Sequence, residues 1–95
     1  MDYHYEIWNV DENERWIYIK CDERDLYDPD SFVYLLEKIQ NDIDGKIIDM
    51  NDNIYKLEND SFDLSFQWDG CFGITVEYPE NISYIEVENF LRKYL

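Results

Sequence analysis

Hydrophobic and polar side chains alternate along several short segments of the chain, which is the pattern of β-strands with one buried face. The alternation is most regular in residues 62–68, where Phe62, Leu64 and Phe66 are separated by polar residues, and it recurs in residues 72–78. Further strands are expected at residues 3–10, 15–21, 46–50 and 54–58.

Two other segments place hydrophobic residues at helical spacing. In the first, Asp28 can cap the free amides, Pro29 suits the first turn, and Gly45 can end the helix in the left-handed conformation. The second opens with a capping box of Ser83 and Glu86. The two apolar stripes are Phe32, Leu35, Leu36, Ile39 and Ile43, then Val87, Phe90, Leu91, Tyr94 and Leu95.

The order of these elements is ββαββββα, which predicts the fold class. We expect a single α+β domain over residues 1–95. Its antiparallel sheet would have five to six strands, with both helices packed on one face.

The turn between the last two strands decides which of their side chains pair. A two-residue Asp69-Gly70 loop would pair Phe66 with Gly73 and put the apolar faces out of register. A three-residue loop that includes Trp68 buries one continuous face, so we predict that register. Its pairs are Phe66 with Phe72, Leu64 with Ile74, and Phe62 with Val76, and its opposite face carries Asp63, Ser65, Gln67, Thr75 and Glu77.

The second strand has two chemically different faces. Ile17, Ile19 and Cys21 alternate with Trp16, Tyr18 and Lys20, so one face is aliphatic and the other is aromatic with a charge. The aromatic face could lie under a helix or be open to a partner.

The net charge of the chain bears on its function. The chain has 23 acidic and 8 basic residues, a net charge of −15, and self-repulsion of this size opposes compact folding. A disordered acidic tail is excluded, because 45% of the residues are hydrophobic and 18% are aromatic. Solubility needs a net charge of only about 2–8. We therefore expect a basic protein as the partner, and neither nucleic acid nor a membrane as a direct ligand.

The candidate binding residues are acidic and aromatic. Acidic side chains group in a loop, in a hairpin region and on the open face of the last hairpin, and each group alone could be a solvated surface. Trp16 and Tyr18 are candidate anchors, since Trp and Tyr are typical of interface hot spots. The three groups are Asp22, Glu23, Asp25, Asp28 and Asp30; Asp49, Asp52, Glu58 and Asp60; and Asp63, Asp69 and Glu77.

Catalytic and metal-binding motifs are weak by comparison. His4 is the single histidine, and no residue is evident that would orient it as a base. Residues 49–53 partly resemble a calcium loop, but Ile54 stands where that loop needs glycine, which favours a polar hairpin turn. Cys21 and Cys71 are expected to be reduced thiols. We expect that the protein is not an enzyme and needs no cofactor. A metal-dependent enzyme or a calcium sensor is a further hypothesis, beside the two binding functions given below.

The segment Phe66-Gln67-Trp68-Asp69-Gly70-Cys71-Phe72-Gly73-Ile74-Thr75-Val76, followed by an amphipathic helix, resembles small bacterial immunity proteins. These are the partners of contact-dependent growth inhibition toxins and other polymorphic toxins. The resemblance covers about the last third of the chain. It implies a cytosolic protein that neutralises the toxic C-terminal domain of a cognate effector, often a basic nuclease. No functional residue is carried over from it.

The leading hypothesis is therefore a stoichiometric inhibitor of a basic toxin domain. It would occlude the active site or an adjacent exosite of that domain. The alternative is a phage-type nucleic-acid mimic, whose acids would be spaced like phosphates along an elongated surface. The N-terminus has no signal-peptide pattern, so we expect a cytoplasmic protein.

Overall fold

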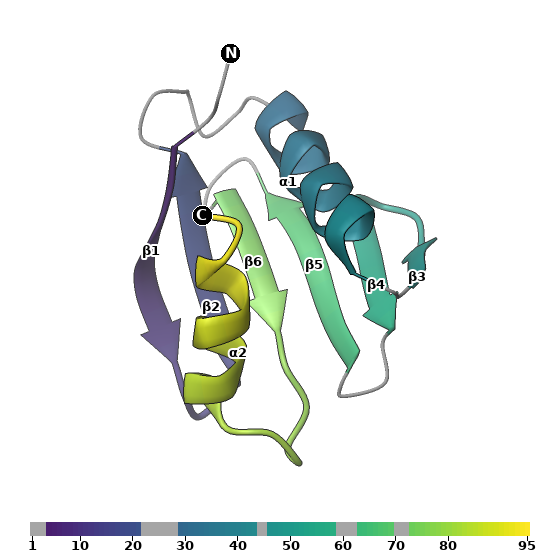
Figure 1. The fold of residues 1–95 in the computed structure, drawn as a ribbon. Helices are drawn as coiled ribbons and strands as arrows, with labels where there is room; N and C mark the ends of the chain where they lie inside the picture. Colours follow the sequence, from purple (N-terminus) through teal and green to yellow (C-terminus); the bar gives the residue numbers. More distant parts are fainter. Residues whose placement is uncertain (1–3, 22–28, 44–45, 59–62, 70–72) are drawn as a thin grey trace.

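The computed structural model describes residues 4–21, 29–43, 46–58, 63–69 and 73–95. These residues form one antiparallel sheet with two helices on one of its faces (Figure 1). The predicted α+β class and the order ββαββββα are confirmed. The strands are β1 (Tyr5–Asp11), β2 (Trp16–Cys21), β3 (Lys46–Asp49), β4 (Ile54–Glu58), β5 (Asp63–Asp69) and β6 (Gly73–Glu77), and the helices are α1 (Pro29–Asp42) and α2 (Tyr84–Arg92).

The strand order brings together strands that are far apart in the sequence. The sheet runs β1-β2-β6-β5-β4-β3, so the first hairpin lies beside the last strand. After β2 the chain crosses the sheet through α1 to the opposite edge, and β3 to β6 then return strand by strand. Helix α1 lies over β4 and β5, and α2 lies over β2 and β6 (Figure 1).

The core lies between the sheet and the helices. It takes alternate residues from the strands and the predicted stripe from each helix, because those are the side chains that face the opposite layer. Burying them removes apolar surface from water, which is the main force that stabilises the fold. The buried hydrophobic residues include Ile17, Ile19, Phe32, Leu35, Ile39, Leu57, Leu64, Phe66, Ile74, Val76, Val87 and Leu91.

One polar contact joins α1 to the sheet, and another caps the N-terminus of α2. The hydroxyl of Tyr5 on β1 donates to the carbonyl oxygen of Ser31 in the first turn of α1, at 2.6 Å and in a buried position. Helix α2 begins after Ser83, whose Oγ accepts from the backbone N–H of Glu86 at 3.4 Å, as the predicted cap requires. Asp28 and Gly45, the expected ends of the first helix, lie outside the described residues.

The predicted register of the last hairpin is wrong. Phe66 pairs with Val76 rather than Phe72, and Trp68 pairs with Ile74 instead of belonging to the loop. The ladder continues to Asp69 and Gly73, so the connection consists of residues 70–72. This register extends β5 and lets Trp68 pack against the core. The shift is an even number of residues, so the predicted faces of both strands are unchanged.

The residues that partly resemble a calcium loop form the turn between β3 and β4. Asn51, Asp52 and Asn53 all have positive φ, at 74°, 56° and 62°, which Asn and Asp tolerate better than most residues. Asp49 Oδ1 accepts from the backbone N–H of Asn51 at 2.8 Å. The interpretation as a polar hairpin turn is confirmed.

The two cysteines differ in what the structure describes. Cys21 is a free, buried thiol at the end of β2. Cys71 lies outside the described residues.

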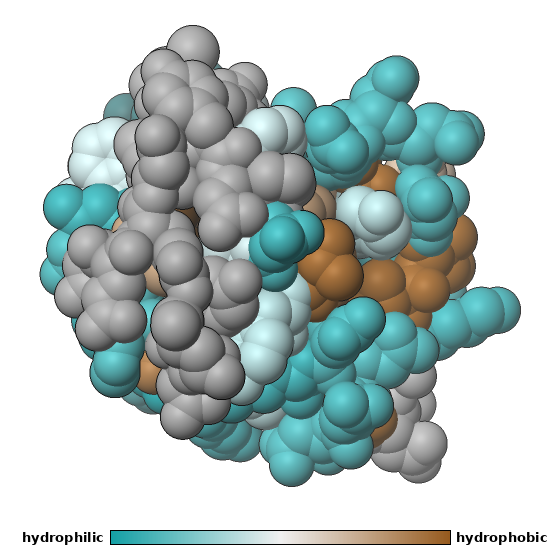
Figure 2. Space-filling model, turned by 90° about the horizontal axis from the view of Figure 1, so that it is seen from above, coloured by the Kyte–Doolittle hydropathy of each residue, from teal (hydrophilic) through white to brown (hydrophobic). Residues whose placement is uncertain are grey.

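The described residues present both polar and apolar side chains to solvent. Viewed from above, the described surface is largely hydrophilic, with one hydrophobic patch bordered by hydrophilic residues (Figure 2). Trp8, Val33, Met50 and Ile85 are the exposed large hydrophobic residues of the described chain. Exposed apolar side chains of this kind are ordinary when they are scattered, and only a cluster of them marks an interaction site.

Candidate functional site on the helix-free sheet face

One face of the sheet carries no helix, and we call it the helix-free face. Because side chains alternate along each strand, the neighbours of the buried residues point to this face. The strand register places them in two rows that cross the sheet. One row is Asp11, Trp16, Glu77, Ser65 and Lys56, and the other is Asn9, Tyr18, Thr75, Gln67 and Ile54.

Three aromatic rings gather on the β1–β2 part of this face, and we call Trp8, Trp16 and Tyr18 the aromatic cluster. The ring centroids of Trp8 and Tyr18 are 5.8 Å apart, and those of Trp16 and Tyr18 are 6.1 Å apart in an edge-to-face arrangement. A bulge between Ile7 and Asn9 shifts the register of β1 at Trp8. Trp8 is 43% exposed, so the cluster presents a ring to solvent.

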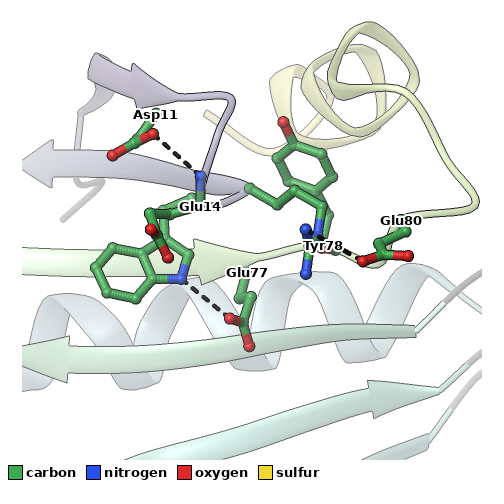
Figure 3. A network of polar contacts seen from close by, with 7 residues as sticks. Asp11, Glu14, Glu77, Tyr78 and Glu80 are labelled. Atoms are coloured by element: carbon green, nitrogen blue, oxygen red, sulfur yellow. Dashed lines mark hydrogen bonds and ion pairs between the residues drawn. The ribbon is translucent and has the colours of Figure 1, made fainter.

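A hydrogen bond joins the aromatic cluster to the last strand. The indole Nε1–H of Trp16 donates to Oε2 of Glu77 at 3.0 Å, between the adjacent strands β2 and β6 (Figure 3). The carboxylate is therefore held beside the rings, although its residue is exposed. The contact depends on the β2–β6 pairing, which places Trp16 opposite Glu77.

The turn between β1 and β2 adds further negative charge beside the cluster. We call Asp11, Glu12 and Glu14 the acidic turn. Asp11 Oδ1 accepts from the backbone N–H groups of Asn13 and Glu14, both at 3.1 Å, which fixes the turn. Burial, together with the nearby charges of Asp11 and Glu14, raises the pKa of Tyr18 above its ordinary value. The acidic turn therefore acts electrostatically on the aromatic cluster.

Arg15 follows the acidic turn, and its side chain contacts residues that follow β6. Its φ is 61°, in the left-handed region, so it belongs to the turn and not to β2 as predicted. Its Nε donates to the carbonyl oxygen of Tyr78 at 3.2 Å, and its guanidinium pairs with Glu80 at 3.7 Å (Figure 3). Within the part of the chain that the structure describes, none of the three acidic-turn carboxylates forms an ion pair.

A shallow groove of about 520 Å³ lies on the β4–β6 part of the same face. Its charged lining residues are Arg15, Lys56, Asp63 and Glu77, so positive and negative charges balance there. Lys56 pairs with Glu58 at 3.5 Å and with Asp63 at 3.9 Å. The groove is therefore less acidic than the region around the aromatic cluster.

The structure brings together some of the predicted site residues and separates others. Trp16, Tyr18 and Glu77 meet on the helix-free face. Asp63 lies on the same face, but across the groove and paired with Lys56. Asp30 lies on α1, Asp49 on β3, Glu58 on β4 and Asp52 in the turn between these two strands, so they are not part of the aromatic cluster. The other candidates, Asp22, Glu23, Asp25, Asp28, Asp60 and the side chain of Asp69, lie outside the described residues.

The sequence prediction did not select Trp8 or the acidic turn as site residues. Trp8 falls within the strand expected at residues 3–10, and the acidic turn falls between that strand and the one expected at residues 15–21. The signal that could have selected them was their closeness in sequence to Trp16 and Tyr18 across a short hairpin. Glu77, in contrast, joins them only through the pairing of β2 with β6.

Other kinds of site find less support in the geometry. Within the described ranges, no group of three or more His, Cys, Asp or Glu side chains is placed to hold a metal ion. His4 is exposed and precedes β1. No helix in the described part of the chain is long and apolar enough to cross a membrane.

Comparison of the chain with protein-family models, with curated proteins and with solved structures found no match.

Proposed function

We propose that this protein is a stoichiometric inhibitor that binds and neutralises a basic toxin domain, a nuclease, in the manner of an immunity protein. The observation that carries the proposal is the aromatic cluster beside Glu77 and the acidic turn on the helix-free face. Trp and Tyr rings that become buried on association are typical anchors of protein interfaces. Carboxylates around them select a basic partner and accelerate its association.

Inhibition of this kind needs no chemistry by the inhibitor. The carboxylates would pair with lysines and arginines that a nuclease uses to hold phosphates, and the bound sheet would cover its active site or an adjacent exosite. The net charge of −15 would raise the rate of association, because it attracts a basic partner over a long range. The proposal includes a cytoplasmic location, where such a toxin acts.

The alternative, a nucleic-acid mimic, needs carboxylates spaced like phosphates along an elongated surface. The extents of the molecule are 33 × 28 × 26 Å, which is not elongated. The charges of the helix-free face are also uneven, since its groove is balanced by Arg15 and Lys56. These observations favour an interface matched to one partner.

The test combines capture with inhibition. Tagged protein is incubated with lysate of the organism that encodes it, and the retained proteins are washed at low and then high salt. A basic protein retained at high salt is purified, and its nuclease activity is measured against increasing amounts of inhibitor. Loss of activity that is complete at a one-to-one ratio supports the proposal.

Two results would contradict it. If the retained nuclease keeps its activity in the complex, the protein is not an inhibitor. If many nucleic-acid-binding proteins are retained and all are released by salt, the nucleic-acid mimic becomes the better explanation.

A further inference from the structure

The aromatic cluster has the geometry to accept a cation. We propose that it binds an arginine side chain of the basic partner, with the guanidinium against the rings and its N–H groups toward the surrounding carboxylates. The inference rests on the proposed function in one respect, namely that the partner is a basic protein. The arginine site itself can be tested without that partner.

The rings provide the first part of such a site. A cation is attracted to the face of an aromatic ring, most strongly to Trp, when it lies within about 6 Å of the ring centre. The planes of Trp8 and Tyr18 are inclined by 50°, and those of Trp16 and Tyr18 by 82°. The three rings therefore do not stack on one another face to face, and Trp8, which is 43% exposed, offers the accessible ring surface for a planar group.

The carboxylates provide the second part. Oε2 of Glu77 is held by the Trp16 indole, which fixes the carboxylate beside the rings. Asp11 and Glu14 are near enough to Tyr18 to act on it electrostatically, so negative charge lies on the turn side of the cluster as well. A carboxylate binds a guanidinium through paired hydrogen bonds, and the planar guanidinium also stacks on rings. An ammonium group lacks the planar shape, so arginine is favoured over lysine.

The two described cations nearest to the cluster along the chain have partners of their own. Lys20, on the same strand as Trp16 and Tyr18, pairs with Glu6 at 3.2 Å. Arg15 donates to the Tyr78 carbonyl oxygen and pairs with Glu80. The groove beside Glu77 is the weaker candidate, because Lys56 already pairs with Asp63 there.

The test uses a small probe, the capped peptide acetyl-Gly-Arg-Gly-amide, titrated into ¹⁵N-labelled protein and followed by NMR. The matched control peptide has citrulline in place of arginine, which keeps the shape and removes the charge. We expect saturable shifts of the Trp8 and Trp16 indole signals with the arginine peptide and much smaller shifts with citrulline. Trp68 packs on the core side of the sheet and is the internal control, whose indole signal should not move.

Two variants locate the site. Trp8→Ala removes an exposed ring. We expect it to lower the affinity for the arginine peptide about two- to fivefold, as for a solvent-exposed cation–π contact. Glu77→Gln removes the charge but keeps the shape of the side chain, and it should also lower the affinity for the arginine peptide. The matched control is Glu37→Gln, an exposed acid on α1 that should leave binding unchanged.

Several outcomes would overturn the inference. These are the absence of saturable shifts, equal shifts with both peptides, or equal loss of binding in Glu37→Gln and Glu77→Gln. A larger shift of the indoles with adenosine monophosphate than with the arginine peptide would also overturn it, since the rings would then be a base-stacking surface. Arginine binding without any inhibited toxin would leave this inference standing and contradict only the proposed function.

Discussion

Trp16 and Glu77 are 61 residues apart in the chain, yet the indole N–H of one donates to the carboxylate of the other at 3.0 Å. The contact joins the first hairpin to the last strand on the surface of the sheet. It fixes both a ring and a charge in the region that we propose binds the partner. Hydrogen bonds to charged groups are stronger than neutral ones, so an exposed contact of this kind can still hold a side chain in place.

Trp16→Phe should separate the two roles of this residue. The change keeps an aromatic ring and removes the donor, so we expect the free energy of unfolding to fall by about 0.5–1.5 kcal/mol, the usual worth of one hydrogen bond. Partner affinity should fall as well, because the Glu77 carboxylate is no longer held. Urea unfolding and calorimetric titration measure the two effects. The control is Trp8→Phe, which makes the same change in the same cluster but keeps the hydrogen bond between Trp16 and Glu77. Equal partner affinity in the wild type and Trp16→Phe would contradict the positioning role of Trp16.

Charge reversal should slow association only on one face of the molecule. Glu77→Lys lies beside the aromatic cluster, whereas Glu37→Lys lies on α1, and both change the net charge equally. We expect Glu77→Lys to reduce the association rate constant about tenfold at low salt, with a smaller reduction at high salt, because steering is screened. Stopped-flow mixing with the captured partner measures this. Equal rates for the two variants would show that only the total charge matters.

Tyr5→Phe should destabilise the fold without affecting the interface. Its hydroxyl donates to the Ser31 carbonyl oxygen in a buried position and so ties β1 to α1. Losing this bond should lower the free energy of unfolding by about 1 kcal/mol. Tyr55→Phe is the matched control, since Tyr55 packs its ring on Phe32. Equal denaturation midpoints for the two variants would show that the Tyr5 hydrogen bond adds nothing.

The stability of the protein should fall in strongly alkaline solution because of Tyr94. Burial, and then the hydrogen bond of its hydroxyl to Asp42 at 2.8 Å, raise the pKa of Tyr94 to about 12, from 10.0. The folded state therefore keeps a proton that the unfolded state loses. The stabilisation is complete below pH 10 and is lost as the pH rises from 10 to 12.

Urea unfolding at several pH values tests this prediction. Tyr94→Phe should be less stable than the wild type at neutral pH, but its stability should fall less between pH 10 and 12. Parallel curves for the two proteins would show that other tyrosines cause the decline. Tyr18, Tyr78 and Tyr84 also have raised pKa values, so some decline should remain in the variant.

The faces of the strands could be predicted from the sequence, but their register could not. Alternation repeats every two residues, so pairing Phe66 with Phe72 or with Val76 buries the same side chains. The prediction chose the wrong register because it treated Trp68 as a loop residue. Packing of Trp68 against the core favours the longer strand, and that packing is a property of the folded molecule.

The candidate site was predictable only in part, for a related reason. Trp16 and Tyr18 could be assigned to a polar or aromatic face by alternation, but whether a helix covered that face depended on where α1 and α2 pack. Glu77 could be assigned to the face opposite the core. Its position next to Trp16 required knowing that β6 pairs with β2.

The sequence by itself determined the elements, their order and the side of each strand that is buried, because periodicity and capping are local properties of the chain. It also determined the excess of negative charge. Only the tertiary structure decided the strand order, and with it the meeting of Trp16, Tyr18 and Glu77 on one helix-free face. Such contacts join distant segments, and they form only when the whole sheet and both helices bury a common core.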